Sequence, residues 1–130
     1  MKRGIYVASR TKHAAMWKQC RAEGVPIIST WIDEAGEGET ANFGDLWLRI
    51  QKEVVGAERL VFFAENGDFP LKGALIEVGM ALAAGVPVYL VLDPETELEE
   101  RSLRPLGSWA RHPHVCWKTT LGDAFAETPY

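Results

Sequence analysis

The chain has 130 residues, a common length for one domain, so we expect a single domain spanning residues 1–130. Its 14 basic and 18 acidic residues give a formal net charge of −4, which leaves no broad basic surface for a nucleic-acid backbone. With 47% hydrophobic and 25% charged residues, the composition is that of a globular domain with a buried core and excludes wholesale disorder.

No segment is typical of a membrane anchor or an export signal. The first apolar segment, 5–8, is followed at once by polar and charged residues. The longest charge-free segment, 78–92, is interrupted by glycine and proline and is shorter than the ~20 apolar residues that span a bilayer. Cys20 and Cys116 lie far apart without metal-type spacing, which suits a reducing compartment. We therefore expect a cytoplasmic protein with no membrane partner.

Apolar segments of strand length alternate with segments of helical period along the chain. The expected strands are 4–9, 26–31, 60–64 and 88–92. The expected helices are 12–23, a helix after the acidic loop 33–40 with apolar residues at 43, 46, 47, 50 and 54, and 73–84. A short helix at 95–101, a fifth strand at 115–117 and a terminal helix at 121–126 follow. This order predicts an α/β fold: a doubly wound parallel sheet in a three-layer, flavodoxin-like or Rossmann-like arrangement.

Ligands of such sheets bind beyond the carboxyl ends of the strands. The residues at those ends are Ser9, Arg10, Trp31, Asp33, Glu34, the segment 65–72 and Asp93. They combine hydroxyl, guanidinium, aromatic and carboxylate groups, which suit a sugar, a base and a phosphate. We expect a small-molecule ligand of this kind.

Glu77 is the most unusual residue of the sequence. It is the one carboxylate in a helix, 73–84, that is otherwise apolar on every side, so the helix should be largely buried. Burial of a glutamate side chain destabilises the folded protein by several kcal/mol unless the side chain is paired, protonated or lines a cavity. A solvent-facing glutamate is the simpler alternative, but no other polar residue marks an exposed stripe. Gly73, beside Lys72 at the start of this helix, allows close approach of a ligand.

Each of the other candidate residues also has a simpler, structural interpretation. Ser9 and Arg10 could hold an anion, or could be a helix cap and an exposed arginine. Trp31 could stack on a base or only pack. Asp33 and its acidic neighbours could bind a cation but do not match a calcium-loop spacing, and the glycines at 36 and 38 do not form a phosphate loop.

A histidine and cysteine cluster near the C-terminus superficially suggests a metal site. His112, His114 and Cys116 would share one face of a strand. Residues i and i+4 of a strand lie roughly 13 Å apart, whereas zinc ligands lie about 2.0–2.3 Å from one ion. We therefore expect neither a metal nor another cofactor.

Three segments resemble one known family. They are the first strand, 5–9, the third strand, 60–64, and above all KGALIEVGMALAAGVPV at 72–88. The last segment is similar to the Gly-x-x-x-Glu-x-Gly stretch of the nucleoside 2-deoxyribosyltransferase superfamily, which continues through small residues to Gly-x-Pro-Val. It also resembles small members encoded by phages and prophages. The resemblance covers about residues 4–92 and implies that 1–130 form one domain of this superfamily.

The resemblance implies a role for Glu77 as the nucleophile of a glycosyl-transfer enzyme. Ser9 and Arg10 match in kind the phosphate-binding residues of the deoxynucleoside 5′-monophosphate N-glycosidases of the same superfamily. The family's aspartate before the motif glycine is displaced here, which makes Glu65 or Asp68 the expected proton donors. Members often complete their sites across subunits, which together with Trp47, Trp109 and Trp117 outside the strongest core segments predicts a homo-oligomer.

The leading hypothesis is therefore an enzyme that cleaves or transfers the N-glycosidic bond of a deoxynucleoside, nucleoside or nucleoside 5′-monophosphate through a covalent glycosyl-enzyme. A non-catalytic nucleotide-binding module of the same fold is the alternative. A phosphoacceptor receiver domain has a similar layout, but it needs an aspartate after the third strand and acidic residues after the first. This chain has Glu65 and the pair Ser9 and Arg10 there.

Overall fold

The computed structural model describes residues 4–35 and 40–126, and the sequence-based expectations for 36–39 lie outside these residues. The strands are β1 (Ile5–Ala8), β2 (Arg59–Ala64), β3 (Val88–Leu92) and β4 (Val115–Lys118). The α-helices are α1 (Ala14–Ala22), α2 (Phe43–Gly56), α3 (Lys72–Ala83) and α4 (Leu121–Phe125), and the 3-10 helices are η1 (Thr11–His13), η2 (Thr30–Asp33) and η3 (Ser108–Arg111). None of the helices in these residues is long and apolar enough to cross a membrane.

The four strands form one parallel sheet in the order β1-β2-β3-β4. On the outer side of β1, Ile27 pairs with Ile5 in a single parallel bridge. The chain therefore runs to one side of β1 first and to the other side afterwards. The carboxyl ends of β1 and β2 thus flank the point where strand order reverses, which is where ligands of such sheets bind.

The predicted second strand, 26–31, is wrong apart from this one bridge. Pro26 has no amide to donate, and the Ser29 hydroxyl accepts the Val7 amide at 2.7 Å, so a side chain takes the place of a ladder bond. The chain then turns into η2. The predicted short helix at 95–101 is also wrong, because Glu99 bonds across a turn to the Arg104 backbone and side chain. The strand and helix predicted near the C-terminus are confirmed as β4 and α4.

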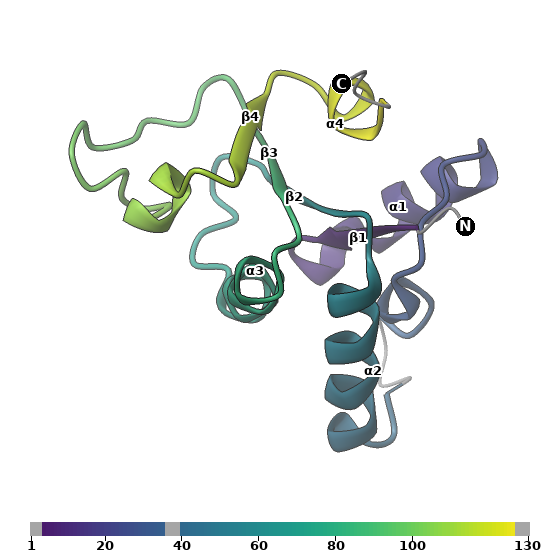
Figure 1. The fold of residues 1–130 in the computed structure, drawn as a ribbon. Coiled ribbons are helices and arrows are strands. Elements are labelled where there is room, and N and C mark those ends of the chain that lie inside the picture. The colour runs from purple at the N-terminus through teal and green to yellow at the C-terminus, as the bar shows by residue number, and fades with distance from the viewer. Residues whose placement is uncertain (1–3, 36–39, 127–130) are drawn as a thin grey trace.

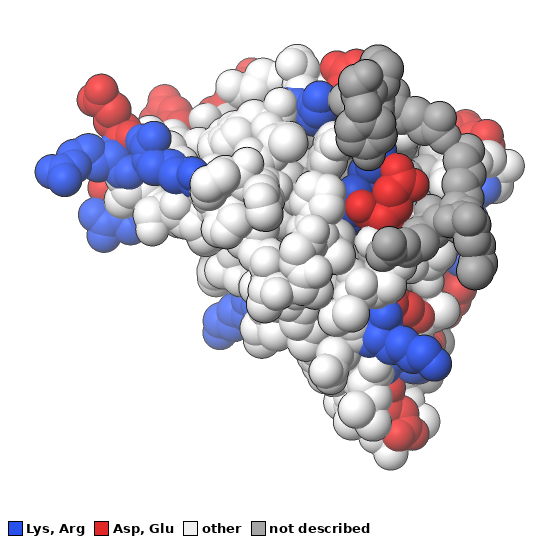
Figure 2. Space-filling view, in the orientation of Figure 1, with Lys and Arg blue, Asp and Glu red and all other residues white. Residues whose placement is uncertain are grey.

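The layers around the sheet confirm the predicted three-layer α/β fold (Figure 1). On one face, α3 packs on β1, β2 and β3 and carries α2 beside it. On the other face, Trp17 of α1 meets Phe63 of β2 and Phe125 of α4, with ring centroids 6.1 and 6.2 Å apart. The lower end of α2 projects beyond the rest of the fold in Figure 1, and the surface over α2 and α3 has a broad region without charged side chains (Figure 2).

Candidate active site

A cavity of about 570 Å³ lies at the carboxyl end of β1, between α2 and the start of α3. It is lined by Ser9, Arg10, Thr11, Trp31, Phe43, Leu46, Trp47, Ile50, Pro70, Leu71, Lys72, Gly73, Ala74 and Glu77. Six of the candidate residues named from the sequence are therefore brought together here: Ser9, Arg10, Trp31, Lys72, Gly73 and Glu77. Asp33, Glu65 and Asp68 are not in the lining.

Glu77 is buried in this lining, with 8% of its surface exposed. The Tyr6 hydroxyl, from the neighbouring strand β1, donates a hydrogen bond to its Oε1. Burial raises the pKa of Glu77 to about 7, the Tyr6 hydrogen bond opposes this rise, and the charge of Glu53 adds to it. Burial next to Glu77 also raises the pKa of Tyr6 well above its ordinary value, so Tyr6 keeps its proton and stays a donor. The result is an anchored carboxyl group that ionises near neutral pH.

One face of α2 forms an apolar wall of the cavity. The helix begins after Asn42, whose side chain accepts the Asp45 amide at 3.1 Å. Residues 43, 46, 47 and 50 then fall on one face because of the helical period. They run from exposed Phe43 to buried Ile50, with Leu46 and Trp47 between them in exposure. The sequence pattern predicted an apolar face on this helix. It did not distinguish a face that packs on a sheet from a face that lines a cavity, because both have the same pattern.

The segment after β1 provides the polar side of the cavity. Ser9 Oγ accepts a hydrogen bond from Trp17 Nε1 at 2.8 Å and donates one to the Arg10 carbonyl at 2.9 Å. Ser9 does not cap η1; Arg10 occupies that position and makes no capping bond with its side chain. Arg10 Nη1 donates to the carbonyls of Pro70, at 3.2 Å, and Asp68, at 3.4 Å. These bonds fix an exposed guanidinium at the edge of the cavity.

The two residues nominated from η2 have different positions. Trp31 is buried, lines the cavity and donates from Nε1 to the Val7 carbonyl at 2.8 Å. Asp33 lies outside the lining because the 3-10 turn directs it to α1, where its carboxylate accepts two hydrogen bonds from Arg21, at 2.7 and 3.0 Å. The hydrogen bond from Arg21 lowers the pKa of Asp33. Asp33 therefore fastens η2 to α1 instead of facing the cavity.

Asp68 holds the loop between β2 and α3 against η1. Its buried carboxylate lies 2.7 Å from Lys12 Nζ and 2.8 Å from His13 Nε2, and it accepts the Glu65 amide at 2.8 Å. Burial acts to raise the pKa of Asp68, but these three partners outweigh it and lower the pKa to about 2. Asp68 is thus a permanent carboxylate that shapes the loop carrying Pro70 and the start of α3. The sequence held no local signal for this, because His13 is 55 residues away.

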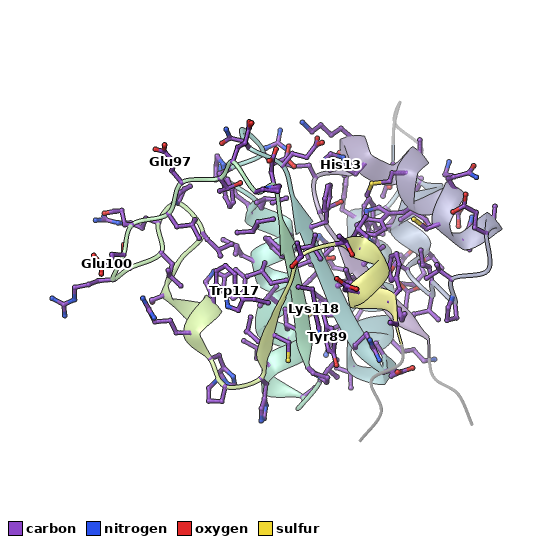
Figure 3. The ribbon with its side chains drawn as sticks, turned by 90° about the horizontal axis from the view of Figure 1, so that it is seen from above. His13, Tyr89, Glu97, Glu100, Trp117 and Lys118 are labelled. Atoms are coloured by element: carbon purple, nitrogen blue, oxygen red, sulfur yellow. The ribbon has the colours of Figure 1, made fainter. Side chains whose placement is uncertain are left out.

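Glu65, His13 and Asp68 also form the group best suited to a metal among residues 4–35 and 40–126. Their ligand atoms all lie within 4.8 Å of one another. Glu65 Oε1 is 3.6 Å from His13 Nε2, and its side chain is half exposed. Figure 3 shows His13 at the upper edge of the molecule, beside α1. Since the Lys12 ammonium already neutralises Asp68, we interpret the cluster as a hydrogen-bonded clamp.

No protein-family model matches the sequence, and no curated protein is significantly similar to it. Comparison of the structure with solved structures does find a match, the 2-deoxyribosyltransferase of the bacterium Bacillus psychrosaccharolyticus. The TM-score is 0.62 at 18% sequence identity, and the match covers 96% of this chain and 92% of that enzyme's chain. The chain has the fold of this 2-deoxyribosyltransferase. The resemblance predicted from residues 72–88 is thereby confirmed at the level of the fold.

Proposed function

We propose that the protein cleaves or transfers the N-glycosidic bond of a deoxynucleoside, nucleoside or nucleoside 5′-monophosphate, with Glu77 as the nucleophile. The observation that carries the proposal is the buried carboxyl of Glu77, anchored by Tyr6 in a cavity with one apolar and one polar side. The fold shared with a 2-deoxyribosyltransferase supports it. The test is incubation with a panel of nucleosides and their 5′-monophosphates, with release of free base as the readout.

The proposed chemistry has two displacement steps. A carboxylate oxygen of Glu77 attacks the anomeric carbon of the sugar, the bond from that carbon to the base nitrogen breaks, and its electron pair leaves with the base. The product is a glycosyl ester of Glu77. Water or a second base then attacks the same carbon, loses the proton of its attacking atom to solvent and displaces the Glu77 carboxylate. Adding a second base to the assay separates transfer from hydrolysis.

The departing base also needs a proton. The sequence pointed to Glu65 or Asp68, but neither lies in the cavity lining. Asp68, with its pKa near 2, holds no proton to give at neutral pH. We therefore propose that solvent water donates this proton in place of either carboxyl group.

Arg10 is proposed to bind a 5′-phosphate. It is exposed at the cavity edge, and its bonds to Pro70 and Asp68 use Nη1, which leaves other guanidinium donors for an anion. We expect Arg10→Ala to reduce kcat/KM for a nucleoside monophosphate by about tenfold or more, since a charge-assisted hydrogen bond contributes ~1.5–3 kcal/mol. Turnover of the free nucleoside should not change.

The matched control is Arg21→Ala, which removes an arginine paired with Asp33 outside the cavity. It should leave the preference between nucleotide and nucleoside intact. Equal kcat/KM of the wild-type protein for the two forms would show that Arg10 does not select phosphate.

A non-catalytic nucleotide-binding module is the second candidate, favoured by the absence of a proton-donating aspartate from the described cavity lining. Such a module would bind a nucleotide, measured by calorimetry, without releasing base over long incubation. Base release that depends on Glu77 would reject it.

We also propose that the protein is a homo-oligomer that associates through the uncharged surface over α2 and α3. Leu48 of α2 is 67% exposed and Ile76 of α3 is 54% exposed. Figure 2 shows a broad region without charged side chains over these two helices. Light scattering at micromolar concentration should show at least a dimer, and Leu48→Glu with Ile76→Glu should shift it to the monomer. A monomeric wild-type protein would reject this proposal.

A further inference from the structure

Two sets of contacts join the segment after β1 to the loop between β2 and α3. Arg10 Nη1 donates to the backbone carbonyls of Asp68, at 3.4 Å, and Pro70, at 3.2 Å. Lys12 Nζ and His13 Nε2 lie 2.7 and 2.8 Å from the carboxylate of the same Asp68. Asp68 therefore contacts the arginine at the cavity edge through its backbone, and the two following residues of η1 through its side chain.

We propose that Asp68 is a positioning residue for Arg10 and thereby sets the preference of the cavity for a 5′-phosphate. The inference rests on the proposed function, in which Arg10 binds that phosphate, and adds to it the residue that orients the guanidinium. Asp68 is not part of the cavity lining, so it acts through Arg10 and not on the ligand. A guanidinium recognises phosphate in a fixed orientation, which other contacts must hold.

The position of the loop depends on Asp68 more than on its other residues. Residues 65, 66, 67 and 70 are exposed and Phe69 is half-buried, whereas Asp68 is only 1% exposed. Without the contacts of this carboxylate, little holds the carbonyls of Asp68 and Pro70 in place against Arg10. Because a hydrogen bond weakens steeply once its angle falls below ~120°, a small shift of the loop releases the guanidinium.

Ser9 increases the dependence on Arg10. Its hydroxyl already donates its proton to the Arg10 carbonyl and accepts a hydrogen bond from Trp17 Nε1. A hydroxyl has one proton, so Ser9 has none left for a phosphate. Ser9 thus fixes the backbone of Arg10, Asp68 orients its side chain, and the phosphate preference depends on that orientation.

The first experiment uses Asp68→Asn in a Glu77→Gln background, which stops turnover. Calorimetry gives the ratio of affinities for a deoxynucleoside 5′-monophosphate and for the matching deoxynucleoside. Asparagine keeps the shape and an oxygen for the Glu65 amide, but it has no charge to hold Lys12. By Coulomb's law alone, loss of a negative charge near the phosphate raises this ratio. Positioning predicts the opposite sign, a fall of about fivefold or more.

The second experiment repeats the measurement in the Arg10→Ala variant. If Asp68 acts through Arg10, Asp68→Asn should not lower the ratio of Arg10→Ala any further. A general loosening of the cavity would instead weaken nucleoside and nucleotide binding alike. It would also add to the effect of Arg10→Ala. The double variant therefore separates a positioning role from a structural one.

Lys12→Ala tests the same contact by a change at a residue that is 58% exposed, so the fold should be kept. We expect the ratio to fall about threefold, less than for Asp68→Asn, because His13 still contacts the carboxylate. Lys12→Arg should restore the ratio, since a guanidinium also pairs with a carboxylate. In the Arg10→Ala background, Lys12→Ala should have no effect, whereas direct attraction between Lys12 and phosphate would persist. Lys18→Ala, which removes an exposed lysine of α1, is the control and should not change the ratio.

The outcomes separate this inference from the proposed function. A ratio that is unchanged or higher in Asp68→Asn and Lys12→Ala, or that falls further when either is added to Arg10→Ala, overturns the positioning role alone. A lowered ratio that depends on Arg10, in a protein that releases no base, supports the positioning role and rejects the enzyme. Equal affinity of the parent protein for the two ligands overturns both the phosphate role of Arg10 and this inference, even where base release is found.

Discussion

Replacing Glu77 with glutamine should abolish base release while leaving nucleotide binding intact. Glutamine keeps the size of the side chain and an oxygen that can accept the Tyr6 hydrogen bond, but its amide cannot form a glycosyl ester. We expect kcat to fall by about a thousandfold or more, as when a covalent nucleophile is removed from other enzymes. Single-turnover base release and calorimetric affinity, measured on the same sample, would separate chemistry from binding.

The matched control is Glu97→Gln, which removes an exposed carboxylate from the loop beyond β3. Figure 3 shows Glu97 projecting outward on the left of the view, away from His13 and α1. This variant should turn over substrate at the wild-type rate. Base release by Glu77→Gln at a rate close to that of Glu97→Gln would reject the nucleophile.

The pH profile gives a second, independent check on the same residue. Attack needs the carboxylate form, and burial raises the pKa of Glu77 to about 7. In the free protein, kcat/KM should therefore rise with pH through one ionisation near pH 7 and level off above it. An activity that is constant between pH 5.5 and 8 would show that Glu77 does not ionise in the step that limits kcat/KM.

The parts of the fold that the sequence predicted are those in which local pattern and tertiary burial agree. Residues 60–64 and 88–92 are apolar throughout because both faces of β2 and β3 are covered, and the glycine and proline after α3 mark its end. The segment 26–31 reads as a strand by composition. Its pairing was instead limited by Pro26 and by the bond between Ser29 and the Val7 amide, which no local pattern shows.

In the candidate site, too, the residues with a local sequence signal were predicted and those that depend on distant contacts were not. Glu77 was evident from the sequence because a single carboxylate in an apolar helix is a local anomaly. The role of Asp68 was not, since it depends on Lys12 and His13, which reach it only in the folded chain. The apolar wall that includes Trp47 was predicted as a helix face, but its neighbour is a cavity and not a sheet. The roles of Asp68 and of the α2 face depend on contacts between residues far apart in the sequence, which local patterns do not reveal.

The same Glu77→Gln change should make the protein more stable at alkaline pH. The pKa of Glu77 is raised from its ordinary value of 4.5 to about 7, so the folded protein holds this proton more tightly than the unfolded chain does. Stability is therefore lost as pH rises from 4.5 through 7, by on the order of 3 kcal/mol once the group is ionised. Glutamine carries no charge at any pH and avoids this loss.

Urea unfolding at pH 4 and at pH 8 would measure the effect. The free energy of unfolding of Glu77→Gln minus that of the wild-type protein should be larger at pH 8 than at pH 4 by on the order of 3 kcal/mol. The same measurement on Glu97→Gln, which changes an exposed carboxylate, is the control. A pH-independent difference for Glu77→Gln would mean that the carboxyl ionises as in water. A neutral side chain of the same shape would stabilise the fold better at pH 8. A buried carboxyl group that instead destabilises the folded protein when it ionises is what the proposed role of Glu77 as a nucleophile predicts.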